Sequence, residues 1–256
     1  MGNVAGAADA GALSLLRRKL ASLGFHGEYE LRCLQDGVAP RRSVLPGKDI
    51  VGAGDGPAHV TVLLTGVACL YQTLESGERQ IYAFYYAGDF CDLHAYVAPE
   101  RDLAVGALTD CTLGCIPYKD LDQAIKRHPE LAIAWWRVAM LEARGIRERL
   151  LNVSRRSALE RVAHLLCEQL HRRKAIGIDS QVIPLTQIEL ADAVGLSAVH
   201  VNRIVQELRN LGALSRKCRA IEVANPQLLQ ELAGFDAKYL TAPEMLAQWE
   251  VKTSSE

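Results

Sequence analysis

The residues best suited to chemistry in this sequence lie between Ser197 and Gln206, and the chemistry they suit is hydrogen bonding to the edges of nucleic-acid bases. Arg203 can donate two parallel hydrogen bonds to O6 and N7 of a guanine. His200 and Asn202 offer further polar groups on the same side of a helix, and Val199 stands beside them. The predicted base-reading residues are therefore Arg203, His200, Asn202 and Val199.

Two short helices joined by a tight turn are predicted to position these residues. Apolar residues recur every three or four positions on both sides of the turn, at Leu190, Ala191, Val194, Val201, Ile204, Val205 and Leu208. Gly195 can adopt the left-handed conformation that ends the first helix, and Ser197 can cap the second. With the apolar positions turned inward, the second helix can lie in a DNA major groove.

A basic hairpin follows the second helix. Residues 211–215 and 220–223 have the composition of short strands, and the turn between them carries three positive charges. A wing in this place would bring those charges to the phosphate backbone, where they add affinity without sequence information. The predicted phosphate contacts are Gln187, Ser197, Arg216, Lys217 and Arg219.

Three other interpretations compete with DNA binding. Helix-turn-helix spacing also occurs by chance inside helical domains. An enzyme would need a convergent constellation, but no nucleophile or glycine-rich phosphate loop accompanies the polar residues of the N-terminal half, so we expect no catalytic residues. A regulatory protein that acts through protein contacts stays open. Affinity for random duplex DNA that falls steeply as salt rises would separate DNA binding from the other readings.

Charge is distributed unevenly along the 256 residues, which are long enough for two domains. The formal net charge is −1, so nucleic-acid affinity has to come from a local patch. Between Arg155 and Asn225 there are 11 positive and 7 negative side chains, a net of +4 against −5 for the remainder. This asymmetry is expected where one domain meets phosphate and the other does not.

The sequence also indicates a compartment. It contains neither a run of ~18 apolar residues nor a basic segment followed by an apolar one at its start, so we expect a cytoplasmic protein with no membrane partner. Its 7 cysteines are scattered and odd in number, which favours reduced thiols. No cluster of cysteine and histidine has the spacing of a metal site, so no metal is expected.

The fold class predicted from composition and periodicity is α+β. We expect an arm and short helix at 1–28, an antiparallel β-roll (jelly-roll-like) sensor domain at 29–126, a dimerisation helix at 127–153, a winged helix-turn-helix domain at 154–226, and a tail at 227–256. Strand-like runs alternate with turn signals between Arg41 and Pro117 at the spacing of an antiparallel barrel or sandwich.

The long helix is predicted to form a homodimer. A helix of about seven turns between two domains has few partners within its own chain, so its apolar stripe would be buried against a second copy. Packing on its own β domain is the alternative. The residues predicted for the interface recur at threes and fours: Leu131, Trp135, Val138, Leu141, Glu142, Ile146 and Arg149.

In order and composition these parts resemble the CRP/FNR family of bacterial transcription regulators, most specifically over Pro184 to Leu214. The resemblance implies a sensor β domain, a dimer helix, and a recognition helix that reads a palindrome and works with RNA polymerase. It places Arg203 where the family's arginine contacts guanine. Val199 stands where many members carry a glutamate and Ala198 where some carry a second arginine. Both departures remove polar base contacts, so the family's common half-site is not carried over to this protein.

The effector does not follow from the resemblance. Cyclic-nucleotide members have a Gly-Glu pair followed by Arg-Ser or Arg-Thr, whereas here Asp92 lacks the preceding glycine and Asp102 follows Arg101. A carboxylate beside the phosphate would repel it. Cys33 stands alone, which disfavours an iron-sulfur cluster. Cys91 and His94 lie where a haem-sensing relative keeps its cysteine and histidine ligands, but the cysteine is offset by one, so haem is less favoured than ordinary packing or a helix-cap role for His94. The weak sensor-pocket candidates are Asp92, His94 and Arg101.

Overall fold

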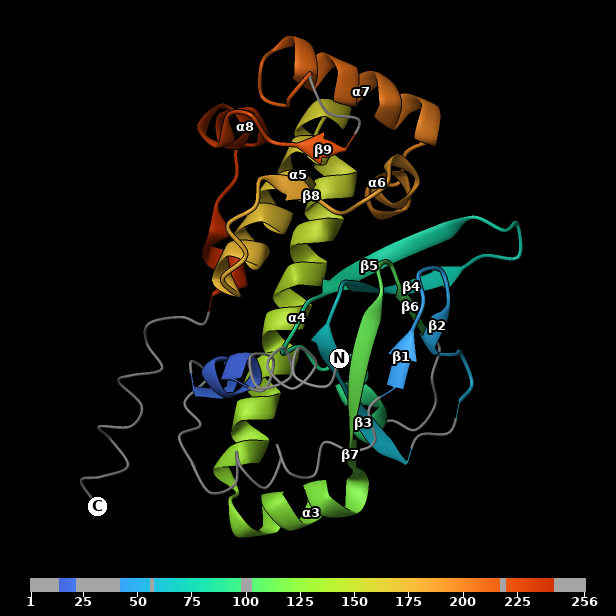
Figure 1. Cartoon of the computed structure of the whole chain (residues 1–256), viewed down its shortest axis with the longest axis vertical. Helices are drawn as coiled ribbons and strands as arrows, with labels where there is room; N and C mark the ends of the chain where they lie inside the picture. Colours follow the sequence, from blue (N-terminus) through green and yellow to red (C-terminus); the bar gives the residue numbers. More distant parts are fainter. Residues whose placement is uncertain (1–13, 22–41, 56–57, 98–102, 217–219, 242–256) are drawn as a thin grey trace, which may run out of the picture. The chain divides into compact units, whose positions relative to one another are not determined.

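The computed structural model describes residues 14–21, 42–55, 58–97, 103–216 and 220–241. They divide into two compact units, one ending within a long helix at Ala143 and the other running from Arg144 to Leu240 together with segment Tyr71–Ala83. In chain order the strands and helices (Figure 1) are β1 (Arg42–Val44), β2 (Asp49–Val51), β3 (His59–Thr65), β4 (Ala68–Thr73), β5 (Arg79–Tyr85), η1 (Leu93–Tyr96), β6 (Ala104–Ala107), β7 (Cys111–Pro117), α3 (Tyr118–Arg127), α4 (Glu130–Arg155), α5 (Ala158–Ala175), β8 (Val182–Ile183), α6 (Gln187–Val194), α7 (Ala198–Asn210), β9 (Ile221–Glu222), α8 (Pro226–Ala233) and η2 (Ala237–Leu240).

Two sheets form the N-terminal β domain, which confirms the predicted antiparallel architecture. One sheet has the order β1-β7-β3 and the other β2-β6-β4-β5. Both neighbours of β7 run antiparallel to it, with Val62 opposite Gly114 in the β3 pairing. The turn after β3 requires glycine, because Gly66 has φ +94° and a Cβ there would lie 2.3 Å from the Asp110 carbonyl oxygen.

The core of this unit includes the first half of α4. Leu131, Trp135 and Val138 are 0%, 6% and 1% exposed and join a buried cluster with strand β3 and the helical segment 14–21, and the Phe90 and Trp135 rings meet edge to face at 6.2 Å. These three residues were predicted to contact a second subunit, and the structure corrects that assignment. Leu141 is half-buried against the same cluster, so the alternative of packing on the β domain describes this face.

Periodicity alone could not distinguish the two apolar sides of α4. Its other side is exposed and includes Ile133, Trp136 and Met140 at 56%, 70% and 48%. A long helix with apolar residues over more than half its circumference offers two neighbouring stripes, and only tertiary packing decides which one is buried. The stripe that the sequence suggested for the dimer is mostly the one that the subunit buries.

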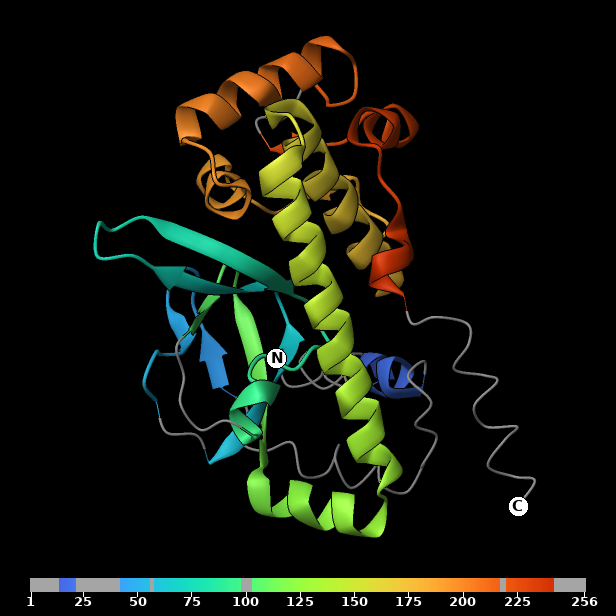
Figure 2. The ribbon, with the colours of Figure 1, turned by 180° about the vertical axis from the view of Figure 1, so that it is seen from behind.

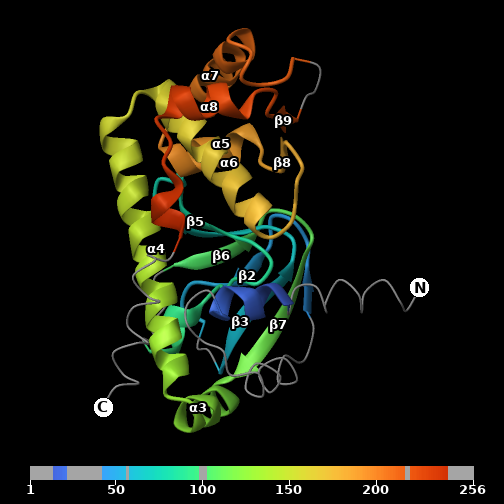
Figure 3. The ribbon, with the colours of Figure 1, turned by 90° about the vertical axis from the view of Figure 1, so that its left-hand side faces the viewer.

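Helices α6, α7 and α8 pack around α5 in the C-terminal unit (Figure 3). Capping boxes start two of these helices: Ser157 and Glu160 exchange hydrogen bonds at α5, and Thr186 and Glu189 do so at α6. The segment expected to be a tail begins instead with α8 and η2, whose Leu229 and Tyr239 are buried. The domain therefore extends beyond the boundary predicted at 226.

A buried polar cluster joins the end of α4 to α5 and η2 in this unit. Glu168, 4% exposed, accepts hydrogen bonds from Arg149 at 3.2 and 3.3 Å, from Arg172 at 3.0 Å and from the Tyr239 hydroxyl at 3.0 Å. Burial alone would raise the pKa of Glu168, but the two guanidinium groups and the hydroxyl outweigh it, so the pKa lies below its ordinary value. We call these four residues the Glu168 cluster.

The Glu168 cluster corrects a second part of the predicted dimer interface. Arg149 is 9% exposed and holds a buried carboxylate of its own chain, so it is not available to a partner. Ile146, from the same prediction, is 47% exposed, and Glu142 is half-buried.

No helix in the described part of the chain is long and apolar enough to cross a membrane.

Candidate nucleic-acid interface

Helices α6 and α7 form the predicted helix-turn-helix. Gly195 ends α6 at φ 65° and ψ 43°, the left-handed conformation expected of it. The Ser197 hydroxyl caps α7 by accepting a hydrogen bond from the His200 amide at 3.2 Å. The buried positions of the two helices include the seven apolar residues that the sequence pattern turned inward: Leu190, Ala191, Val194, Val201, Ile204, Val205 and Leu208. The turn thus fixes how α7 is rotated relative to α6.

One side of α7 faces away from α5 and α6 (Figure 2). Val199 is 82% exposed in the first turn, Asn202 and Arg203 are exposed one turn later, and His200 is half-buried. Within the described part of the chain the Arg203 guanidinium has neither a hydrogen bond nor a salt bridge. A rigid helix therefore presents an apolar contact and an uncommitted bidentate donor on a single face.

Asn202 and Gln187 are brought together, although the sequence assigned them to different tasks. The Asn202 Nδ2 atom donates a hydrogen bond to Gln187 Oε1 at 2.9 Å, from α7 to the first residue of α6. Gln187 is half-buried and its Nε2 group remains a donor after this bond is made. A predicted base reader and a predicted phosphate contact are thus coupled directly.

Only part of the wing lies within the described residues. Leu214 and Val223 form an isolated antiparallel bridge, and the Ser215 amide donates to the Glu222 carbonyl at 2.8 Å, as the strand composition predicted. Strand β9 also pairs with β8, so Ile221 lies opposite Ile183. Lys217 and Arg219, two of the predicted phosphate contacts, lie outside the described residues.

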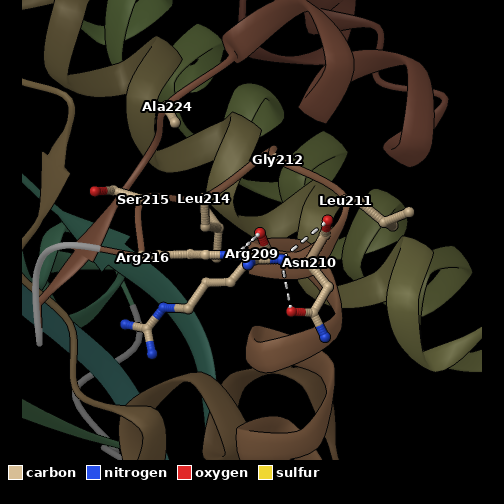
Figure 4. A pocket seen from close by; sticks show the side chains of 8 residues that line it. All are labelled: Arg209, Asn210, Leu211, Gly212, Leu214, Ser215, Arg216 and Ala224. Atoms are coloured by element: carbon tan, nitrogen blue, oxygen red, sulfur yellow. Dashed lines mark hydrogen bonds between the residues drawn. The ribbon is translucent and has the colours of Figure 1, made fainter.

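Arg216 makes contacts within its own chain that the sequence did not predict. Figure 4 shows its side chain lying across the end of α7, where Nε donates to the Arg209 carbonyl at 3.1 Å and Nη2 to Asn210 Oδ1 at 2.9 Å. The last carbonyls of a helix have no partner within the helix and carry its partial negative charge. Arg216 thus caps the C-terminus of α7 and lines an open cleft with Arg209, Asn210 and Ser215. This structural role was not predicted, and the phosphate contact of Arg216 stays a prediction.

Several other arginines of the basic domain also serve the fold. Arg161 donates to the Val194 carbonyl at the end of α6 at 3.2 Å, Arg173 donates to the Val182 carbonyl at 2.5 Å, and Arg156 pairs with Glu148 at 2.7 Å. Sequence charge counting treated all of these as part of one basic patch. Fewer basic side chains are therefore left uncommitted for phosphate than the 11 counted in the sequence.

Two of the three sensor-pocket candidates, Asp92 and His94, lie in the described residues. Asp92 is 1% exposed, and its carboxylate accepts hydrogen bonds from the Thr61 amide at 2.6 Å and the Thr61 hydroxyl at 3.0 Å. It therefore fastens η1 to β3. His94 is exposed, and Arg101 lies outside the described residues. Because Asp92 is committed to Thr61, it does not fit the ribose-binding role that the resemblance suggested for it.

Comparisons with known proteins agree with this division of the chain. Residues 41–128 match the family described as a cyclic nucleotide-binding domain, and residues 160–232 match a Crp-like helix-turn-helix domain. The transcriptional activator protein FnrL of Cereibacter sphaeroides is 30% identical over 204 residues, which cover 77% of this chain and 81% of that protein.

Two further similarities extend over most of the chain. The fumarate and nitrate reduction regulatory protein of Vibrio cholerae is 27% identical over 209 residues, covering 81% of this chain and 84% of the relative. The solved structure of FixK2 from Bradyrhizobium japonicum has a TM-score of 0.68 at 28% identity, over 76% of this chain and 97% of that one. The similarity includes both domains and the helix that connects them.

Proposed function

Because the chain belongs to the CRP/FNR family of transcription regulators, whose members are not enzymes, we propose that it acts as a homodimer that binds a palindromic promoter site. The observation that carries this proposal is the outward face of α7, where Arg203 is exposed and has no partner in the described residues. Polar groups that a fold leaves unused on a rigid helix are available to a ligand. We place the activity in the cytoplasm, with RNA polymerase as the second protein partner.

Recognition follows from the geometry of the helix pair. With α7 in the major groove, the Arg203 guanidinium donates two hydrogen bonds, to O6 and N7 of a guanine. The Gln187 Nε2 group, the Ser197 hydroxyl, Lys217 and Arg219 contact phosphates and fix the register without reading sequence. In a symmetric dimer the two half-sites lie about one helical turn apart, ~34 Å.

The exposed side of α4 supplies a surface for the dimer. Ile133, Trp136, Met140 and Ala143 follow the alternating three- and four-residue spacing of a two-stranded coiled coil. Leu150 lies seven residues beyond Ala143, with the charged Arg147 at the intervening position. Trp136 and Leu150 are 70% and 65% exposed, which is costly for side chains that stay in water. We therefore assign the interface to this stripe, which lies beside the one suggested by the sequence. Ile146 is the one earlier candidate that stays exposed.

Two substitutions that introduce negative charge into this stripe test whether it forms the dimer interface. Trp136→Glu with Met140→Glu should give monomers that no longer bind the palindrome, as measured by analytical ultracentrifugation and fluorescence anisotropy. Lys119→Glu with Lys126→Glu, on α3, is a control that changes the charge away from the stripe and should leave the dimer intact. A wild-type protein that sediments as a monomer at micromolar concentration would contradict the proposal.

Site selection from random duplexes tests DNA recognition. The wild-type protein should enrich a palindrome, with affinity that falls steeply between 50 and 200 mM salt. Arg203→Ala should flatten the profile at one base pair in each half by ~1 to 3 kcal/mol. Arg127→Ala, which removes the same charge from the exposed surface of α3, should keep the profile. Uniform weakening by Arg203→Ala with no change in preferred sequence would show that Arg203 is not the base reader.

The signal sensed by the β domain is unidentified. A regulatory protein that works through protein contacts is the second candidate, and it is favoured if the selection enriches no sequence.

For the β domain we propose no binding of cyclic AMP or cyclic GMP through Asp92, because that carboxylate accepts hydrogen bonds from Thr61. Calorimetric titration with either nucleotide should show no saturable heat, and a micromolar dissociation constant would overturn this part of the proposal.

A further inference from the structure

The hydrogen bond between Asn202 and Gln187 constrains a side chain that the recognition face otherwise leaves mobile. Asn202 is exposed on α7, and its Nδ2 group lies 2.9 Å from Gln187 Oε1. An exposed carboxamide normally samples several rotamers and both orientations of its oxygen and nitrogen. Here one amide hydrogen bonds to α6, which restricts the orientation of the other amide hydrogen and of Oδ1.

We propose that Asn202 reads an adenine in the major groove and that Gln187 is the positioning residue that orients it. This inference rests on the proposed function and deepens it by naming a second base of the half-site, in a different base pair from the guanine of Arg203. Gln187 holds Asn202 before DNA arrives, so less conformational freedom is lost on binding.

Hydrogen-bonding chemistry selects adenine among the four bases. Adenine presents the N6 amino donor beside the N7 acceptor, which match the Oδ1 acceptor and the remaining Nδ2 hydrogen of Asn202. Guanine presents two acceptors, so its O6 would face Oδ1. Thymine offers an acceptor and a methyl group, and cytosine offers a single donor. Only adenine satisfies both free groups of an asparagine held in this orientation.

Gln187 links this base contact to the DNA backbone. Its Oε1 accepts from Asn202, and its Nε2 group is left to donate to a phosphate. The capping box of Thr186 and Glu189 fixes the first turn of α6, where Gln187 lies. A purely stabilising role for the bond is a weaker explanation, because an exposed hydrogen bond replaces bonds to water and adds little net stability.

Atom-specific base analogues in the selected site test the adenine contact. Asn202→Ala in the full chain should lose the preference for adenine at one base pair per half by about 5- to 150-fold, the equivalent of ~1 to 3 kcal/mol at about 1.4 kcal/mol per factor of ten. Replacing that adenine by 7-deazaadenine, which lacks N7, or by purine, which lacks the amino group, should weaken wild-type binding. Neither analogue should affect Asn202→Ala.

Two substitutions at Gln187 separate its two tasks. Gln187→Glu keeps an acceptor for Asn202 but places a carboxylate where the phosphate donor was, so it should weaken all sequences and preserve the adenine preference. Gln187→Ala should reduce that preference as well as overall affinity. Gln230→Ala, an exposed amide on α8, is the matched control and should change neither. Thermal unfolding of all variants should match the wild type.

The outcomes distinguish this inference from the function on which it rests. Selection of a palindrome that depends on Arg203, but whose every position is unchanged by Asn202→Ala, would overturn the adenine contact and leave the proposed function standing. A base other than adenine at the position that Asn202→Ala affects would also overturn it. A preference that survives Gln187→Ala in full would remove the positioning role. Failure to select any sequence would overturn both proposals.

Discussion

The Glu168 cluster and the outward face of α7 belong to the same compact unit, yet their polar groups have opposite surroundings. Inside the cluster, both oxygens of one carboxylate accept hydrogen bonds from the chain itself. On α7, Arg203 has no partner among the described residues and Val199 is 82% exposed. The first arrangement stabilises the fold, whereas the second leaves side chains available to a ligand, as the proposed function requires.

This difference shows that the surroundings of an arginine decide its role. Arg149, Arg161 and Arg216 all carry the charge that phosphate binding needs, but each donates to a carboxylate or a helix carbonyl of its own chain. Arg203 is the exception on the recognition helix. Substitutions in the two regions should therefore have separable effects, on unfolding in one case and on DNA sequence preference in the other.

The largest effect is expected inside the cluster. Glu168→Leu leaves the buried Arg149 guanidinium without its carboxylate, and breaking a buried ion pair from one side costs ~3 to 5 kcal/mol. Urea unfolding followed by circular dichroism measures this loss. Glu231→Ala, which removes an exposed carboxylate from α8, should cost less than ~0.5 kcal/mol. If both variants unfolded at the same urea concentration, the cluster would not contribute to stability.

The next largest effect is expected from the buried His164, through the pH dependence of stability. Burial and then the nearby Arg156 lower the pKa of His164 to about 4. The unfolded chain therefore takes up a proton at higher pH than the folded chain does. Stability should fall as the pH drops from about 6.5 to about 4, by up to tenfold in the unfolding equilibrium per pH unit.

His164→Phe tests that dependence, because it keeps an aromatic ring beside Phe235 and Tyr239 and has no group to titrate. In this variant the slope of unfolding free energy against pH should flatten between pH about 4 and pH about 6.5. An unchanged slope in His164→Phe would assign the acid sensitivity to other groups.

A change of sequence preference, with little change in stability, is expected at Val199. Val199→Glu places on α7 a carboxylate that can accept from the amino group of cytosine, so the selected half-site should shift toward cytosine at one base pair by ~1 to 3 kcal/mol. Val199→Ala stays apolar and should keep the wild-type base there. Selection of the same half-site by all three proteins would show that residue 199 does not face a base.

The smallest effect is expected at Arg216. Arg216→Ala removes the cap from α7 and should cost ~0.3 to 1 kcal/mol of stability with little change in the salt dependence of DNA binding. Lys217→Ala should do the reverse, lowering the salt slope by roughly one unit and leaving unfolding unchanged. Equal loss of salt slope in both variants would support the phosphate contact of Arg216.

Local signals in the sequence predicted the helix-turn-helix well. Gly195, Ser197 and the apolar period of α6 and α7 depend on contacts within a few residues, and the structure places them as expected. The side chosen for the dimer was mostly wrong, because burial of Leu131 and Trp135 depends on strands far away in the chain. The sequence did contain a signal for the other side: a second apolar stripe, shifted by one position along the chain so that it includes Trp136 instead of Trp135.

Long-range hydrogen bonds explain the other differences. Arg216 is six residues beyond Asn210 and folds back onto it, and Asp92 holds Thr61 from 31 residues away. Residue type gives no information about such partners, so both side chains looked available for a ligand. The bond between Gln187 and Asn202, 15 residues apart, was missed for the same reason.

The position of the Glu168 cluster also determines which piece of this protein could be transplanted. A fragment from Ser157 to Ala233 would contain α5 to α8 and the whole recognition face, but of the three groups that hold Glu168 it would keep only Arg172. Arg149 precedes that fragment and Tyr239 follows it. A portable DNA-reading module for fusion to another sensor would therefore have to run from about 144 to 240, carrying the last turns of α4 with it.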